Sequence, residues 1–322
     1  MDIRTMLVVL LASFFSMNMG ASGFAPSMAA PYGARFLSRR ASLLLFSAFV
    51  SLGAVLAGRR VVQTLSTEVF SVRSTDIRVA LIVMAAATLS LFAANLLRVP
   101  QSTSQVTVAA LAGVGWRMGW LRAAPFRLMV PLWFLLPFTA YLVTLALGSC
   151  AHPRLRRWIM DKELVQRYHL LALLVITSSC YAAFSIGSNN VANAVGPLVG
   201  ARMGGPLGAS LLVAPLFGIG GLVLGKGNLQ TAGRELVPLG ILSSSLVSAV
   251  GASLLLLASA FGMPASEVQI KLGAIFAVGV LKNGHREMFR NPAARRALLV
   301  WAVAPLFSLA TAYLMALLAL HP

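Results

Sequence analysis

The sequence is poor in charged side chains, and above all in acidic ones. Charged residues make up 11% of the 322 residues, and only eight residues are Asp or Glu. A typical soluble domain carries about 25% charged residues. Hydrophobic residues make up 58% of the chain, and the mean hydropathy is +0.85. This composition excludes an ordinary soluble domain and indicates a protein that lies largely in lipid.

Cysteine and histidine are also scarce. The two cysteines, Cys150 and Cys180, lie near apolar segments without a CxxC motif, and the four histidines have no metal-ligand spacing. We interpret the cysteines as packing residues and expect no metal site and no other cofactor. The sequence lacks a Ser/His/Asp set, a paired-carboxylate pattern and a glycine-rich nucleotide loop, so we do not expect an enzyme.

Long apolar runs are what the sequence has instead. They lie near 5–30, 41–57, 79–97, 100–116 and 128–148, and again near 170–200, 207–224, 237–261, 264–281 and 297–318. A helix needs about 20 apolar residues to cross a bilayer. The runs therefore predict an all-α polytopic protein of the cell membrane.

The net charge of +18 comes from short basic clusters between these runs, such as 35–40, 58–60, 154–158 and 291–296. Clusters in such positions are typical of loops that contact anionic lipid headgroups. We therefore expect membrane lipid as a partner and no nucleic acid.

The two halves of the chain repeat each other. Ser185–Arg202 aligns with Asn18–Arg35 at an offset of 167, with matching Gly, Ala and Arg residues. At an offset of 164, 264–279 aligns with 100–115, with matching Pro, Ser, Gln and a final Val-Gly. Matches of Gly, Pro, Gln and Arg in one order are hard to obtain by chance in an apolar sequence.

The repeat predicts the organisation of the chain: a first repeat over 1–150, a basic linker over 151–169 and a second repeat over 170–322. With about five membrane segments in each, the second repeat is inverted relative to the first, a recurrent plan of secondary transporters. The positive-inside rule then favours a cytoplasmic linker, on the same side as the 282–296 loop. Because 5–30 belongs to the first repeat, we expect it to be retained rather than cleaved as a signal peptide.

Two pairs of polar stretches lie within the apolar runs. "GSNN" (187–190) and "GASG" (20–23) form helices poorly, so we expect each to break a helix and expose backbone N–H groups to an anion near the bilayer midplane. The alternative is that these small residues only allow close helix packing. "PQSTSQ" (100–105) and "PASEVQ" (264–269) form the second pair, where Pro begins or breaks a helix and Ser caps it.

These stretches resemble the motifs of the inorganic phosphate transporter (PiT) family, which includes sulfate permeases. Its members have two inverted repeats, each with a "GANDVANAxGP"-type motif and a later "PxSTTH"-type motif. "GSNNVANAVGP" (187–197) is close to the first motif, and "GASGFAPSMAAP" (20–31) is a divergent copy. The stretches 100–105 and 264–269 match the second motif more weakly.

The departures from the family pattern bear on the substrate. Asn190 and Gly23 stand where the motif has Asp, and Gln105 and Gln269 stand where it has His. The resemblance implies that the lost acids bind sodium and phosphate. Sulfate carries no proton near pH 7, so a site built of donors suits it, whereas phosphate carries a proton and suits a carboxylate acceptor.

We therefore favour a sulfate transporter of the sulfate permease branch, with a sodium- or proton-coupled phosphate transporter as the alternative and an anion channel as a third. The expected substrate-binding residues are Ser102, Thr103, Ser188, Asn189, Asn190, Asn193 and Ser266, with Asn18, Ser22 and Gly23 facing them from the first half. A homodimer is left open.

Glu267 is the only acid in either copy of the two motifs. A carboxyl group shielded from water within a membrane can carry a proton, so we expect Glu267 to couple transport to protons rather than sodium. The alternative is an exposed loop acid that precedes a helix.

Overall fold

The computed structural model describes residues 2–72, 75–96, 101–224, 239–284 and 292–320. Apart from an isolated bridge between Phe70 and Leu121, the regular structure of these residues is helical. The helices are α1 (Ile3–Gly33), α2 (Arg39–Ala57), α3 (Arg59–Gln63), the π-helix η1 (Thr64–Glu68), α4 (Ile77–Leu96), α5 (Thr103–Met118), α6 (Ala123–Met160), α7 (Leu164–Asn190), α8 (Ala192–Gly200), α9 (Pro206–Val223), α11 (Ile241–Ala260), α12 (Glu267–Asn283) and α14 (Pro292–Ala319).

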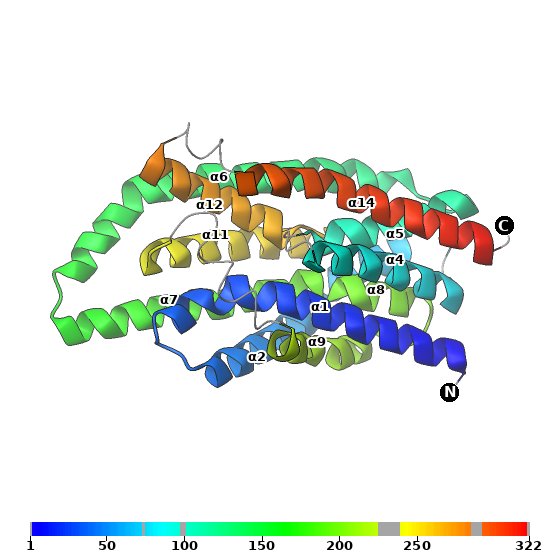
Figure 1. Ribbon diagram of the computed structural model, residues 1–322, viewed down its shortest axis with the longest axis horizontal. Helices are drawn as coiled ribbons and strands as arrows, with labels where there is room; N and C mark the ends of the chain where they lie inside the picture. The colour runs from blue at the N-terminus through cyan, green and yellow to red at the C-terminus, as the bar shows by residue number, and fades with distance from the viewer. Residues whose placement is uncertain (1, 73–74, 97–100, 225–238, 285–291, 321–322) are drawn as a thin grey trace.

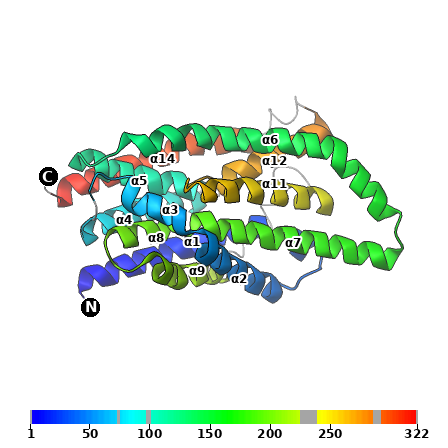
Figure 2. The ribbon, with the colours of Figure 1, turned by 180° about the vertical axis from the view of Figure 1, so that it is seen from behind.

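The helices run roughly along the long axis of an elongated bundle (Figure 1). Both chain ends lie at the same end of the bundle, and the turn between α6 and α7 projects from the opposite end, as the view from behind also shows (Figure 2). The predicted linker over 151–169 is largely helical, because α6 continues to Met160 and α7 begins at Leu164.

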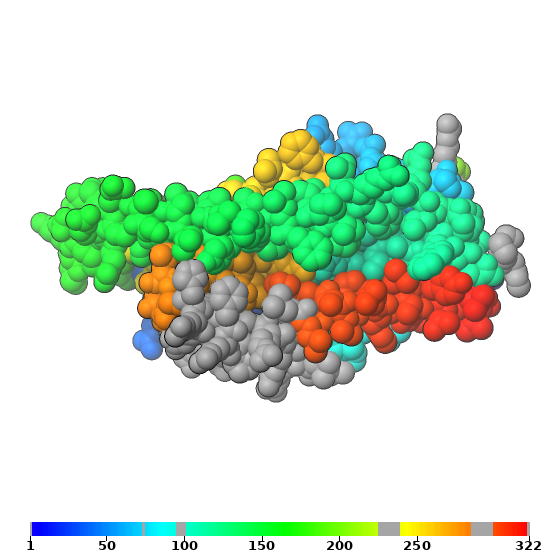
Figure 3. Space-filling model, turned by 90° about the horizontal axis from the view of Figure 1, so that it is seen from above, coloured from blue at the N-terminus to red at the C-terminus, as the bar shows by residue number. Residues whose placement is uncertain are grey.

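Lipid-exposed surface is abundant on the two outer helices α6 and α14. Figure 3 shows them along one face of the molecule, seen from above. Large apolar side chains point outward from both, among them Phe134 and Phe138 of α6 and Leu306 and Leu314 of α14. Together with eight helices in the described residues that are long and apolar enough to cross a bilayer, this marks a multi-pass integral membrane protein.

The ten predicted apolar segments are found as helices, but they are not ten crossings. With 16 and 17 residues, α5 and α12 are too short to count among the eight candidate spans. In Figure 1, α11 and α12 lie side by side and the turn between them is near the middle of the long axis. Helices α4 and α5 contact each other in the same way, mainly on the other side of this point. The proline positions 100 and 264 precede the two short helices. Residues 97–100 and 285–291, the latter in the middle of the predicted 282–296 loop, lie outside the described residues.

The expected helix break at 20–23 is wrong. Helix α1 runs without interruption from Ile3 to Gly33. The close-packing alternative holds here, because a Cβ atom on Gly20 would lie 2.1 Å from the backbone oxygen of Phe217 in α9. A Cβ atom on Gly23 would lie 3.4 Å from the Cδ1 atom of Ile186. Packing of this kind outweighs the cost of about 1 kcal/mol that a glycine imposes on a helix.

The second copy shows only a slight interruption. Helix α7 ends at Asn190 and α8 begins at Ala192, with Val191 between them still in α-helical conformation (φ −60°, ψ −33°). Gly187 again serves close packing, since a Cβ atom there would lie 2.0 Å from the Val50 oxygen of α2. The predicted half-helix end at 187–190 is therefore close to a continuation of the helix. Among the described residues, α5 and α12 start at buried residues after an extended Ser.

Candidate functional site

Helices α5 and α12 begin inside the protein with the same local structure. Ser102 and Ser266 have extended backbones, and each accepts a hydrogen bond from the backbone N–H three residues on, at 3.2 Å in both cases. This is the Ser half of a capping box. Each hydroxyl keeps its own hydrogen to donate, so the predicted donors Ser102 and Ser266 are also the residues that start the two helices.

The glutamines of the two capping sequences bind each other instead of their own helices. Gln105 Nε2 donates to Gln269 Oε1 at 3.1 Å, and Gln269 Nε2 donates to Gln105 Oε1 at 3.0 Å. Both side chains are buried. Because the two residues are equivalent at the offset of 164, this reciprocal pair joins the matching helix starts of the two halves. Sequence analysis identified the two positions but not their contact.

Asn189 fastens the α11–α12 turn to α7. Its Nδ2 donates to Ser259 Oγ at 2.9 Å and to the Met263 oxygen at 3.0 Å, and its Oδ1 accepts from Ala265 N at 2.9 Å. Ser188 also contacts Ser259, at 3.0 Å between hydroxyl oxygens. Both hydrogens of the Asn189 amide are donated to protein groups, and these bonds hold the α11–α12 turn against α7.

Asn190 and Asn193 each have a side-chain oxygen that makes no hydrogen bond within the described residues. Asn190 Nδ2 lies 3.4 Å from Glu267 Oε2, and Asn193 Nδ2 lies 3.3 Å from Thr103 Oγ1 and 3.1 Å from Ser104 Oγ. Neither Oδ1 atom has a hydrogen-bond partner among the described residues, although both side chains are buried. Hydroxyls donate as well as accept, so the Asn193 amide can turn and present its NH₂ group to an anion.

Glu267 forms an ion pair that sequence analysis missed. Its Oε1 contacts Lys271 Nζ, one helical turn further along α12, and both residues are only 6% exposed. Lys271 Nζ also lies 3.3 Å from Ser27 Oγ of α1. The alternative of an exposed loop acid is therefore wrong. The signal was available, because residues four apart share a helix face, but Lys271 lies just beyond the "PASEVQ" motif.

The predicted first-half residues Asn18, Ser22 and Gly23 all lie on α1. Asn18 donates to the Phe14 oxygen at 2.8 Å and Ser22 to the Met19 oxygen at 2.9 Å, both in their own helix. Gly23 packs on Ile186. Lys271 contacts α1 at Ser27, which lies one helical turn beyond Gly23. Gly20 and Gly23 pack against the second half at other residues, Phe217 and Ile186.

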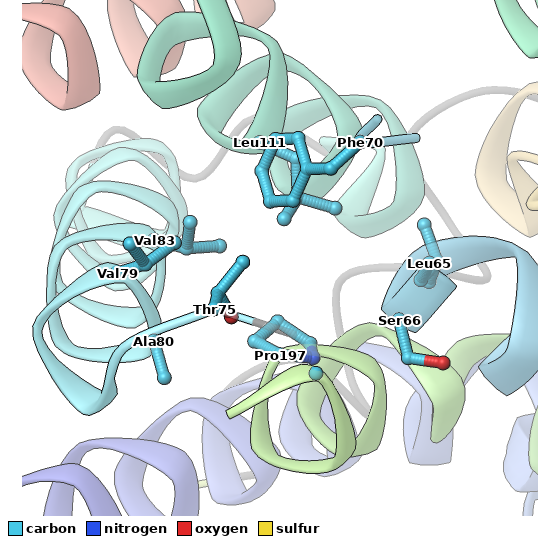
Figure 4. A pocket seen from close by; sticks show the side chains of 10 residues that line it. Leu65, Ser66, Phe70, Thr75, Val79, Ala80, Val83, Leu111 and Pro197 are labelled. Atoms are coloured by element: carbon cyan, nitrogen blue, oxygen red, sulfur yellow. The ribbon is translucent and has the colours of Figure 1, made fainter. Parts of the chain in front are cut away.

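The resulting site is a buried cluster of donors around one ion pair. It contains amide, hydroxyl and ammonium groups at the starts of two helices, where backbone N–H groups and the helix dipole favour an anion. In the part of the chain that the structure describes, no three His, Cys, Asp or Glu side chains are placed to hold a metal ion. A separate pocket, whose side chains include Leu65, Val83 and Leu111, is mainly apolar (Figure 4) and does not suit a divalent anion.

Comparison with known proteins identifies relatives of this chain. A family model described as "Phosphate transporter family" matches residues 19–312. The sulfate permease CysP of Bacillus subtilis is 34% identical over 308 residues, which cover 95% of this chain and 86% of that protein. A putative phosphate permease of Helicobacter pylori (strain J99) is 24% identical over 377 residues, covering 88% and 70%. A solved structure, "The sodium-dependent phosphate transporter", has the same fold, with a TM-score of 0.86 at 21% identity and coverage of 98% and 99%.

Proposed function

We propose that this chain, which belongs to the phosphate transporter family, is a secondary active transporter of a tetrahedral inorganic oxyanion across the cell membrane. Sulfate is the preferred substrate, and protons drive its uptake. The observation that carries the proposal is the set of buried donors at the starts of α5 and α12, with the Glu267–Lys271 pair at the start of α12.

The donor chemistry supports sulfate. Asn190 stands where the family motif has Asp, so the position offers an amide instead of a carboxylate. Lys271 adds three N–H donors and a positive charge within hydrogen-bond reach of Ser27. An anion with four acceptor oxygens and no proton satisfies such donors fully. The 34% identity to a protein named sulfate permease points in the same direction.

Alternating access follows from the proposed inverted repeats. The α4–α5 pair and the α11–α12 pair contact each other at equivalent glutamines near the middle of the molecule. In our proposal they approach this point from opposite membrane faces, and rocking of one half against the other exposes the site to each side in turn. The linker over 151–169 and the end of α12 lie toward one end of the bundle (Figure 1), which we assign to the cytoplasm.

Coupling to cations is required by charge. Carrying one negative charge against an inside-negative potential costs about 2.3 kcal/mol per 100 mV. Sulfate carries two, so at least two cations must enter with it to cancel its charge. Glu267 is the buried group of the site that can take up one proton.

Phosphate is the second candidate, and one observation favours it. The Oδ1 atoms of Asn190 and Asn193 and the Glu267 carboxylate are acceptors beside the donors. They could accept a hydrogen bond from the proton that phosphate retains. The names of several relatives also refer to phosphate.

Uptake into proteoliposomes distinguishes these functions. Labelled sulfate and phosphate are each offered with no gradient, with an inward proton gradient and with an inward sodium gradient. We expect saturable sulfate uptake that the proton gradient stimulates. Non-saturable flux without coupling would indicate a channel, and binding of phosphate at least tenfold tighter than sulfate would contradict the preference.

A further inference from the structure

Lys271 is a cation held deep in a membrane protein. Its side chain is 8% exposed, that of Glu267 is 6% exposed, and the two lie on one face of α12 at a spacing of four residues. The aliphatic part of Lys271 runs past Gly251 of α11, where a Cβ atom would lie 3.2 Å from Lys271 Cγ. The glycine leaves room for the lysine to extend along the helix to Glu267.

Packing alone does not require this pair. Desolvating two charges costs several kcal/mol per ion, and apolar residues of similar volume are often as stable or more so. The equivalent positions of α5, at the offset of 164, are Thr103 and Thr107, which are neutral and equally buried. The same helix start is thus built without charge in the other half, and a charged group inside a membrane protein usually marks function.

We infer that Lys271 is the cationic ligand of the transported anion and that Glu267 holds it while no anion is bound. Protonation of Glu267 and binding of the anion to Lys271 then occur together. This inference rests on the proposed function and specifies how its site couples the anion to a proton.

The charges of the three groups explain the coupling. With Glu267 ionised, the pair is neutral, and its carboxylate repels an entering dianion. When a proton from the entry side binds to a Glu267 carboxylate oxygen, the Lys271 ammonium keeps its three hydrogens and turns them to the anion. The new O–H group becomes a further donor. On the other side the proton leaves Glu267, and Lys271 returns to the carboxylate as the anion departs.

The described neighbours of the pair offer it no other titratable group. In the described part of the chain, Lys271 is the charged group in contact with Glu267, and Asn190 is its neutral neighbour from α7. Helix α11 carries no titratable side chain. The stretch 133–137 of α6, which packs against the start of α12, is apolar. Trp133 donates to the Pro264 oxygen, and Pro137 packs on Gly273. From α1, the contact is the Ser27 hydroxyl.

The test is binding of labelled sulfate to the purified full-length protein between pH 5.5 and 8.5. Wild type should bind more weakly as pH rises, because Glu267 loses its proton and recaptures Lys271. Glu267→Gln, which resembles the protonated acid, should bind with little pH dependence. Adding Lys271→Gln to that variant removes the unpaired buried charge, and it should weaken binding about 10- to 100-fold. Lys282→Gln, on the same helix but exposed, is the matched control and should bind like wild type.

Two outcomes would overturn the inference, and a third concerns the function itself. If the double variant binds sulfate as tightly as Glu267→Gln, Lys271 is not an anion ligand. If wild type binds equally well over the whole pH range, the pair does not exchange a proton for the anion. If wild type binds neither sulfate nor phosphate, the proposed function is wrong, and the inference fails with it.

Discussion

The starts of α5 and α12 share a capping Ser and a paired Gln, here called the shared frame, but they differ in charge. Each begins after a capping Ser whose Oγ accepts a hydrogen bond at 3.2 Å, and each places a Gln in the reciprocal pair between the halves. Where α12 then has Glu267 and Lys271, α5 has Thr103 and Thr107. The frame recurs in both halves and serves the fold. At these equivalent positions only α12 carries an ion pair, and because burying it is costly, we propose that it serves transport.

Breaking the ion pair should have the largest effect on stability. Glu267→Thr gives α12 the residue that α5 has, and it leaves Lys271 buried without its carboxylate. We expect the free energy of unfolding to fall by about 3–5 kcal/mol, measured by denaturation in detergent micelles. Glu267→Thr combined with Lys271→Thr copies α5 completely and should recover most of this loss. A single variant as stable as the double one would show that the pair carries no buried charge.

Disrupting the shared frame should lower the free energy of unfolding by less than breaking the ion pair does. The loss should be the same in both halves. Gln105→Leu and Gln269→Leu each leave one buried amide without its partner, which destabilises by about 1–3 kcal/mol. The double variant should be more stable than the sum of the two losses predicts, because no orphaned amide remains. Unequal single effects, measured under the same denaturing conditions, would contradict the equivalence of the two helix starts.

Replacing the motif asparagine should change selectivity. Asn190→Asp restores a carboxylate acceptor near Glu267, and we expect it to shift the preference toward phosphate by about 1–2 kcal/mol, measured by competition binding. Gly23→Asp, at the equivalent position of α1, faces Ile186 and should destabilise the protein without such a shift. An unchanged preference in Asn190→Asp would exclude Asn190 from contact with the anion.

The smallest effect is expected in α1. Ser22 donates to its own helix at Met19, so Ser22→Ala should change the apparent sulfate affinity by less than about twofold, equivalent to a change within 0.5 kcal/mol. Ser27→Ala removes a contact of Lys271 and should lower the apparent sulfate affinity more than Ser22→Ala does. A larger loss in Ser22→Ala would place the anion beside the 20–23 stretch.

The long apolar runs predicted the helices of the fold, because apolar runs and capping serines act locally. The sequence alone could not exclude a helix break at 20–23. The close contact of Gly20 with Phe217, which packs α1 against α9, joins residues 197 positions apart (217 − 20). Close packing there outweighs a poor local propensity.

The motifs gave the positions of the candidate site residues, whereas the contacts between these residues come from the fold. Asn190, Asn193 and Glu267 lie together as expected. Asn189 matches the same motif, yet its amide is used by the α11–α12 turn. Lys271 lies outside the motif, and it pairs with Glu267 because the two residues are one helical turn apart on α12.

Sulfate uptake driven by a pH gradient tests the central claim most directly. In proteoliposomes, an inward proton gradient should stimulate uptake by wild type, whereas Glu267→Gln should bind sulfate and exchange internal for external sulfate without any stimulation. Exchange needs no net proton movement, so it controls for folding and binding. If Glu267→Gln retains full stimulation by the proton gradient, or if wild type responds to sodium and ignores pH, Glu267 does not couple sulfate to protons.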